Sequence, residues 1–449
     1  MAETSLAVRP GRSESVATAR RPWWRASFAA ALAAAALPLV AGCEPPKTGQ
    51  GKPAPGRAAG VTYETLLADT NAAIASTEAT LKDPLDSALV PLELVGVYAD
   101  RARLTGGYDD YAKAEALLAR LEPKFGRTDD FCLAEARLQY SLHRLAQAKA
   151  ALDGCPRIAG SVEDLRIRAD IAFHTGRYKE AGTVYRALVN QVGTPQTYIQ
   201  LALYSAKTGA PGEAAAFMEA AEKRYLGRSA LQHSWFALQR GLIELDRGRY
   251  EEARALFALA DERLPGYWLN EEHLAEAAGL MGDTATEKRL LQTVIRKTEA
   301  PEYLDALGAL EAEAGNAAAA KPLFDRAEAI YAARAKRFPE AIAGHALDHY
   351  LDAARQPAKA LSLAEANFRN RSYGDAAIAL AKAYLLNDRP KDAVRLLEQE
   401  LAKGWDTAET WWILSVAAQA AGDMARARAA ALEARRRNPH SAAQYAFEP

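Results

Sequence analysis

The chain has 449 residues, more than one hydrophobic core normally serves, so it is either several domains or an array of repeats that contact only their neighbours. Hydrophobic residues make up 49% of the chain but aromatic residues only 8%, and alanine and leucine dominate. This composition predicts an all-α fold, because strands favour β-branched and aromatic residues. The net charge of -1 provides no basic field, so nucleic acid is not an expected partner.

Residues 1–42 have the organisation of a bacterial export signal. Arginines outnumber acidic residues in the opening segment, which carries a net charge of +3, and an apolar stretch follows from Ala26 to Val40. As a helix this stretch would span about 22 Å, short of the roughly 30 Å hydrocarbon core of a bilayer. The segment is therefore predicted to be a signal peptide rather than a permanent membrane span.

The end of this segment, an aliphatic Val40 followed by two small residues and Cys43, resembles the lipobox of bacterial lipoproteins. The resemblance implies that Cys43 is lipidated and becomes the mature N-terminus. Residues 43–60 are rich in proline, glycine and lysine, which predicts a flexible linker. We therefore expect the chain to be anchored by lipid to a membrane of the bacterial cell envelope, facing the periplasm or the cell exterior. The choice of membrane, and of the general or twin-arginine secretion route, stays open.

The rest of the chain contains a pattern that recurs about every 34 residues. Successive units place the same kinds of residue at the same positions, with Leu380, Ala381 and Ala393 in 374–407, and Leu414, Ser415 and Ala427 in 408–441. This pattern resembles the tetratricopeptide repeat (TPR), a pair of antiparallel helices. The resemblance covers residues 88–441 and implies an all-α superhelix, or solenoid, of about ten helix-turn-helix units.

The units differ in how well they match the repeat. Those in 229–449 are regular, those in 88–228 are divergent, and residues 61–87 are predicted to form an N-terminal helical cap. Small residues let the two helices of a unit approach, and larger ones fill the space between units. The predicted units are 88–125, 129–161, 162–194, 195–228, 234–267, 268–300, 301–334, 341–373, 374–407 and 408–441.

In the TPR family the first helix of each unit lines a concave groove that holds a protein or peptide. Transferring those groove positions to this sequence selects Glu272, Glu276, Asp305, Glu313, His345, His349, Asp352 and Trp412, with Trp235 as a further candidate. The acidic residues predict attraction to a cationic peptide or a lysine-bearing surface. A solvated charged face is the alternative interpretation.

His345 and His349 are four residues apart on one predicted helix, a spacing that can place two imidazoles on one metal ion, with Asp352 as a third ligand. The segment lacks the glutamate that serves as general base in zinc peptidases. No metal or cofactor is therefore expected, and a metal-dependent activity at this pair is kept as an alternative.

Cys132 and Cys155 are the cysteines left after lipidation of Cys43. They lie near the start of the first helix and the end of the second helix of one unit, which an antiparallel hairpin brings to the same end. A disulfide is possible in an oxidising compartment, and two buried thiols are the alternative.

The sequence contains no phosphate-binding loop, nucleophile elbow or Cys-x-x-Cys pair. We therefore expect a membrane-tethered scaffold that mediates protein-protein interactions in the bacterial envelope, and no enzymatic activity. A structural spacer is the remaining alternative.

Overall fold

The computed structural model describes residues 60–81, 85–298 and 300–449. These residues form 22 α-helices, a short 3-10 turn η1 (Pro156–Ile158) and a π turn η2 (His349–Ala353). Within the described ranges there is no strand, and Thr208 and Asp406 form an isolated β-bridge. The all-α prediction is confirmed.

The helices run in chain order and their bounds match the predicted repeat closely. They are α2 (Tyr63–Thr80), α3 (Leu89–Thr105), α4 (Asp109–Phe125), α5 (Asp129–Ser141), α6 (Leu145–Asp153), α7 (Val162–His174), α8 (Tyr178–Gln191), α9 (Pro195–Lys207), α10 (Pro211–Arg224), α11 (Ala230–Asp246), α12 (Tyr250–Arg263), α13 (Trp268–Leu280), α14 (Thr284–Thr298), α15 (Pro301–Glu313), α16 (Ala317–Ala335), α17 (Pro339–Asp348), α18 (Pro357–Asn370), α19 (Gly374–Leu386), α20 (Pro390–Lys403), α21 (Ala408–Ala420), α22 (Met424–Arg437) and α23 (Ser441–Gln444).

Each of the ten predicted units is one helical hairpin, from α3 and α4 to α21 and α22, and each hairpin packs on the next. Small residues permit this packing. A β-carbon at Gly241 of α11 would lie 2.4 Å from the ring of Phe257 on α12, and one at Gly308 would lie 2.5 Å from Phe324. Between the helices, Gly248 adopts a φ of +73°, which side chains other than glycine rarely accept.

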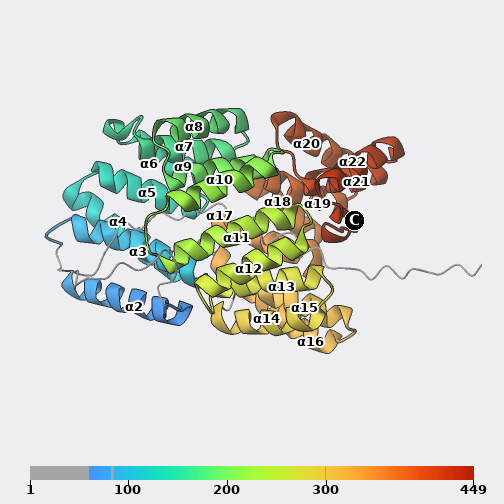
Figure 1. Cartoon of the computed structure of the whole chain (residues 1–449), viewed down its shortest axis with the longest axis horizontal. Helices are drawn as coiled ribbons and strands as arrows, with labels where there is room; N and C mark the ends of the chain where they lie inside the picture. The colour runs from blue at the N-terminus through green and yellow to red at the C-terminus, as the bar shows by residue number, and fades with distance from the viewer. Residues whose placement is uncertain (1–59, 82–84, 299) are drawn as a thin grey trace, which may run out of the picture.

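The hairpins stack into a superhelix (Figure 1), and its early and late parts touch. Trp268 Nε1 donates to the carbonyl oxygen of Leu104, 164 residues away, and the Tyr178 hydroxyl donates to Glu400, 222 residues away. At about 34 residues per unit, these separations correspond to between five and seven units. The superhelix therefore closes on itself instead of leaving an open groove.

The same kind of contact recurs along the chain. Turns inside the early hairpins meet the segments that connect the late hairpins. Asn370 donates to the carbonyl oxygen of His143, Asp406 N–H donates to that of Lys207, and Asn438 donates to that of Asp246. Side chains and turns make these contacts, whereas helix-on-helix packing is confined mainly to sequence neighbours.

A disulfide links Cys132 of α5 to Cys155, which follows α6, with the two Cα atoms 6.4 Å apart. The antiparallel hairpin brings the two residues together from a sequence separation of 23. Both cysteines are buried, and Cys132 lies in the same apolar core as Phe131 and Ile158.

The Cys155→Ser variant is expected to unfold at lower denaturant concentration than the oxidised wild type. The cross-link restricts the unfolded chain, and within one hairpin its loss should cost about 2 kcal/mol. Urea unfolding followed by circular dichroism measures the difference. Reducing agent should bring the wild type to the midpoint of the variant and leave the variant unchanged; equal midpoints without reductant contradict the prediction.

The predicted signal peptide, Cys43 and all of the predicted linker except Gly60 lie outside the described residues. Helix α2 falls within the range predicted as the N-terminal cap and joins the body through a hydrogen bond from Tyr63 N–H to the carbonyl oxygen of Pro265. Among the described helices, none combines the length and the apolar character needed to cross a bilayer.

Candidate functional site

A pocket of about 70 Å³ lies between helices of the early hairpins and two late segments. We call it the lumen pocket. Its lining is rich in aromatic and charged side chains and comprises Tyr140, Asp170, Phe173, His174, Tyr185, Gln200, Leu203, Tyr204, Ala206, Lys207, Gln239, Leu242, Ile243, Asp246, Tyr373, Asp375 and Trp405.

Lys207 is the cation of the lumen pocket. Its Nζ lies 3.6 Å from Asp375 Oδ1 and 3.8 Å from Asp246 Oδ2. Burial lowers the pKa of Lys207, but the carboxylates of Asp375 and Asp246 more than offset that effect and raise it. Burial also raises the pKa of both carboxyls, and Lys207 counteracts this. One ammonium is thus shared between two carboxylates contributed by opposite sides of the pocket.

Asp170 on α7 is a third carboxylate in the lining. The Tyr185 hydroxyl donates to it at 2.7 Å, and Gln200 Nε2 donates to it at 2.8 Å. Burial raises the pKa of Asp170 to about 6, although the Tyr185 hydrogen bond works in the opposite direction. The neighbouring His174 is neutral at pH 7, because burial lowers its pKa to about 4. Asp170 therefore remains largely ionised at pH 7 without a salt-bridge partner among the lining residues.

Aromatic rings form the wall that joins the early and late parts of the chain. The indole of Trp405 lies 5.5 Å from the ring of Phe173 and 5.7 Å from that of Tyr373, between ring centroids. Lys207 Nζ lies 5.8 Å from the centroid of the same indole. Trp405 is fully buried, and its Nε1 has no hydrogen-bond partner within the described part of the chain.

The lining therefore carries three carboxylates against one ammonium. Aromatic faces and carboxylates are the groups that bind organic cations, through the ring quadrupole and through charge-assisted hydrogen bonds. The side chain of Asp246 in this lining is 39% exposed. A single basic group of a partner matches both its size and its charge.

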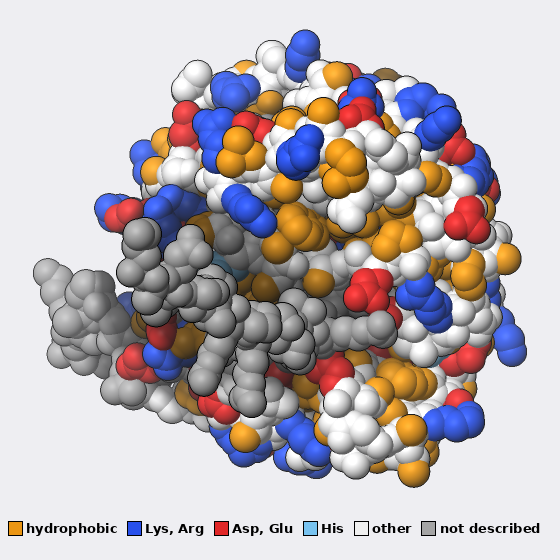
Figure 2. Space-filling model, turned by 90° about the vertical axis from the view of Figure 1, so that its right-hand side faces the viewer, with side chains coloured by type: hydrophobic (Ala, Val, Ile, Leu, Met, Phe, Trp, Pro, Cys, Tyr) orange, Lys and Arg blue, Asp and Glu red, His pale blue; other side chains and the backbone are white. Residues whose placement is uncertain are grey.

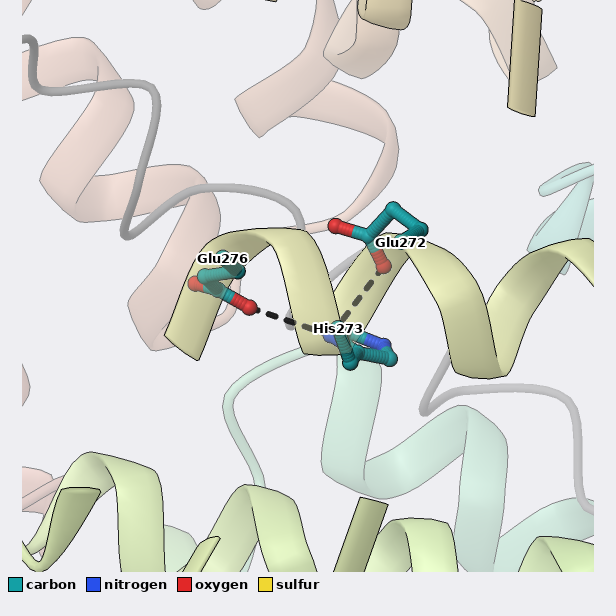
Figure 3. A group of neighbouring side chains, drawn as sticks. All are labelled: Glu272, His273 and Glu276. Carbon is teal, nitrogen blue, oxygen red and sulfur yellow. Dashed lines mark hydrogen bonds and ion pairs between the residues drawn. The ribbon is translucent and has the colours of Figure 1, made fainter. Parts of the chain in front are cut away.

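A second group of polar side chains is buried on α13. Glu272, His273 and Glu276 retain 3%, 2% and 2% of their exposure. Figure 3 shows His273 between the two carboxylates, with Nδ1 3.1 Å from Glu272 Oε2 and 3.0 Å from Glu276 Oε2. The imidazole also stacks on Phe257 of α12, with ring centroids 5.3 Å apart. We call these three residues the α13 cluster.

The α13 cluster has the donor types of a zinc site, one imidazole nitrogen and two carboxylate oxygens. Its donor atoms lie within 4.8 Å of one another, and the distances from Nδ1 approach the roughly 3.3 Å expected between donors around tetrahedral zinc. Burial raises the pKa of Glu272 to about 8 and lowers that of His273. At neutral pH the cluster therefore holds a proton on Glu272, which a metal ion would have to displace.

The buried proton on Glu272 predicts a pH-dependent stability. The pKa of Glu272 is about 8 in the folded chain, against an ordinary value of 4.5. Its contribution to the free energy of unfolding is therefore complete below pH 4.5 and is lost as the pH rises through 8. Glu272→Gln should remove about 2 kcal/mol of this loss, because glutamine stays neutral. Urea unfolding across that pH range measures the two slopes, with the exposed Glu313→Gln as control. Equal slopes for wild type and Glu272→Gln contradict the prediction.

The two predicted histidines pair with two different carboxylates. His345 Nδ1 pairs with Glu302 Oε1 at 3.0 Å, and His349 Nδ1 pairs with Asp305 Oδ1 at 2.8 Å. Both carboxylates come from α15, the first helix of the preceding hairpin. Each imidazole is thus oriented by a carboxylate of its own, and the metal alternative at this pair stays a prediction.

The predicted acidic groove is not one open surface. Glu272, Glu276, Asp305 and His349 are buried, whereas Glu313 is exposed and Asp352 and Trp412 are half-buried. Trp235, the further candidate, is also buried and packs in a core with Ala214 and Met218. The expectation of an exposed acidic face is therefore corrected, since stacking of neighbouring hairpins covers most of these side chains.

Sequence reasoning missed Lys207, Asp170 and Trp405, which lie in the lumen pocket. Asp170 occupies position 9 of its unit, a groove position in the repeat family, and that was the available signal. Trp405 lies in a connection between α20 and α21, next to Gly404 with a φ of +109°. No spacing rule places such a residue against helices more than 200 residues earlier.

One outer face of the molecule carries side chains of both charges. Figure 2 shows the face on the right-hand side of Figure 1, where basic and acidic side chains alternate with apolar ones over the described residues. Such mixed charge gives no directional field for a charged partner.

No protein-family model matches this chain, and no curated protein matches it. Similar solved structures include the Cut9-Hcn1 hetero-tetramer, with 13% identity, a TM-score of 0.41 and coverage of 85% of this chain and 80% of that one. A tetratricopeptide repeat protein from Parabacteroides merdae has 17% identity, a TM-score of 0.38 and coverage of 53% and 93%. A human IFIT1 dimer with PPP-AAAA has 14% identity, a TM-score of 0.41 and coverage of 83% and 86%.

Proposed function

We propose that this chain is a TPR scaffold that binds a partner protein through a basic group, and that it is not a catalyst. The observation that carries the proposal is the charge of the lumen pocket, whose lining holds the carboxylates of Asp170, Asp246 and Asp375 and one cation, Lys207. A lysine, an arginine or an amino terminus of the partner would supply a positive charge beside these carboxylates.

The proposal predicts a selective and salt-sensitive interaction with peptides. Short peptides with a single lysine or arginine among small residues should bind the purified 61–449 chain, whereas the same peptides with glutamate in that place should not. Rising salt should weaken the interaction, because Asp246 is partly exposed and screening acts on it. Fluorescence anisotropy of labelled peptides measures both effects.

Asp246→Asn is the variant that tests the pocket itself. We expect it to lower peptide affinity about tenfold, the loss of one charge-assisted hydrogen bond. Asp325→Asn removes an exposed carboxylate from α16 and should leave the affinity unchanged. Equal affinity of the Asp246→Asn variant and the wild type would falsify the proposed recognition and favour the structural spacer.

We also propose that the scaffold is tethered to a membrane of the bacterial envelope. The support is the sequence of residues 1–60, in which a basic segment, a short apolar stretch and Cys43 follow one another. Cys43→Ala should move the protein from the membrane fraction to the soluble fraction of expressing cells and abolish incorporation of radiolabelled palmitate. Retention of the label by the variant would contradict lipidation at Cys43.

Nucleic acid is not a proposed partner, although a similar structure contains PPP-AAAA. The lumen pocket of this chain is lined by excess carboxylates, which repel phosphate groups. A labelled triphosphate-bearing RNA should show no change in anisotropy at peptide-saturating protein concentrations, and saturable binding would overturn this part of the proposal.

A further inference from the structure

The α13 cluster differs from the other buried histidine pairs of the late hairpins. His345 and His349 each pair with one carboxylate. His273 Nδ1 instead lies 3.1 Å from Glu272 Oε2 and 3.0 Å from Glu276 Oε2. Within residues 60–81, 85–298 and 300–449, the α13 cluster is the group of three such side chains whose donor atoms converge closely enough to hold one metal ion.

The helix places these three donors together. Glu272 and Glu276 are four residues apart, so their side chains lie on the same face of α13. The ring of His273 lies between the two carboxylates (Figure 3). Phe257 of α12 stacks on the imidazole, with an interplanar angle of 24°. Packing therefore holds the ring with its Nδ1 edge toward both carboxylates.

A single hydrogen on Nδ1 does not satisfy this arrangement fully. An imidazole nitrogen carries at most one hydrogen, which points well at only one acceptor, whereas two carboxylate oxygens lie at similar distances from Nδ1. The cluster belongs to a helix that runs through an apolar core with Leu269 and Leu280. Carboxylates buried in such a core are ordinarily paired or bound to a metal ion. A divalent cation at the meeting point of the three donors would contact all of them at once.

The donor set favours zinc among the common divalent ions. Zinc accepts imidazole nitrogen together with carboxylate oxygen, whereas magnesium and calcium prefer a shell made of oxygen atoms alone. Three protein ligands leave the fourth position of a tetrahedral zinc ion to an additional oxygen donor. The donor atoms already lie within 4.8 Å of one another, so small side-chain movements would bring them to an ion.

We propose that the α13 cluster binds one zinc ion through His273 Nδ1 and one carboxylate oxygen each of Glu272 and Glu276. Because the ligands are buried, the ion enters as the chain folds, and its role is structural. The site shares no residue with the lumen pocket and is independent of the partner proposed for that pocket.

The test uses the full chain, without an affinity tag and with Cys43→Ala, because Cys132 and Cys155 are bridged and Cys43 is the remaining thiol. The chain is refolded from urea with zinc or with cobalt(II), and gel filtration removes unbound metal. Elemental analysis should find one zinc ion per chain. The cobalt(II) form should show the intense visible absorption of a four-coordinate ion, and excess magnesium should not abolish it. A chain that retains no zinc after refolding overturns the proposal.

Substitutions assign the metal to its ligands. His273→Gln and Glu276→Gln preserve approximate size and hydrogen bonding, and each should reduce bound zinc to background. His345→Gln is the matched control, because it removes an imidazole that also pairs with a glutamate, and it should leave the zinc content unchanged. Circular dichroism checks the folding of each variant, and the cobalt(II) spectrum of the parent chain decides the matter if a variant does not fold. Zinc retained by folded His273→Gln, or lost by folded His345→Gln, overturns the proposal.

Discussion

Trp405→Ala is expected to lower the free energy of unfolding by about 3 to 5 kcal/mol and to separate the early and late parts of the superhelix. Trp405 is fully buried, and its ring packs against Phe173 and Tyr178, which lie in the early part of the chain. A β-carbon at Gly374 would lie 2.1 Å from the indole, so the late part also fits it closely. The loss therefore removes apolar burial from both sides of one contact.

Two measurements distinguish this effect from ordinary core damage. Denaturant unfolding reports the loss of stability, and small-angle X-ray scattering reports whether the folded chain becomes longer. Phe257→Ala is the matched control, because Phe257 is equally buried but contacts Gly241 of its own hairpin and His273 of the adjacent one, not a distant segment. Both variants should lose stability, and only Trp405→Ala should increase the radius of gyration. If the radius of gyration of Trp405→Ala is unchanged, Trp405 does not hold the early and late parts of the superhelix together.

Lys207→Met is expected to destabilise the chain by about 3 kcal/mol at pH 7, because it leaves Asp246 and Asp375 without their shared cation. Methionine retains most of the apolar stem, so lost charge accounts for the effect. Burial raises the pKa of both carboxyls in the folded chain. Without the ammonium, these carboxyls bind protons more readily, so the deficit of the variant should shrink as pH falls below neutral.

A second substitution provides the test of this explanation. Lys207→Met combined with Asp375→Asn removes one of the two unpaired carboxylates, and we expect it to recover part of the lost stability. Lys179→Met on α8 is the control, since Lys179 is exposed and lies outside the pocket. Urea unfolding near pH 5 and at pH 7 measures each variant. A double variant less stable than Lys207→Met contradicts the proposed sharing of charge.

The hairpins could be predicted because their determinants are local. Gly241 and Gly308 occupy the position at which a helix must admit the ring of its partner, and the rings of Phe257 and Phe324 come from the second helix of the same unit. The information needed for each unit is thus contained in about 34 residues. The spacing of Cys132 and Cys155 placed them at one end of a hairpin for the same reason.

The candidate sites were predicted only in part. The sequence placed Glu272 and Glu276 on one face of a helix, but it did not show that His273 lies between their carboxylates. It placed His345 and His349 on one face, but the carboxylates that orient them come from a different hairpin. Side-chain pairing between hairpins depends on the stacking angle, which the repeat pattern leaves undefined.

The sequence by itself determined that this chain is an all-α array of about ten helical hairpins, because the packing of each unit follows from residues a few turns apart. The tertiary structure decided that the array closes. Closure results from the small rotation of each hairpin on the next, summed over five to seven units, and from contacts such as Tyr178 with Glu400. The lumen pocket exists only where those distant segments meet, so its carboxylates and its single lysine could be assigned only after the fold was known.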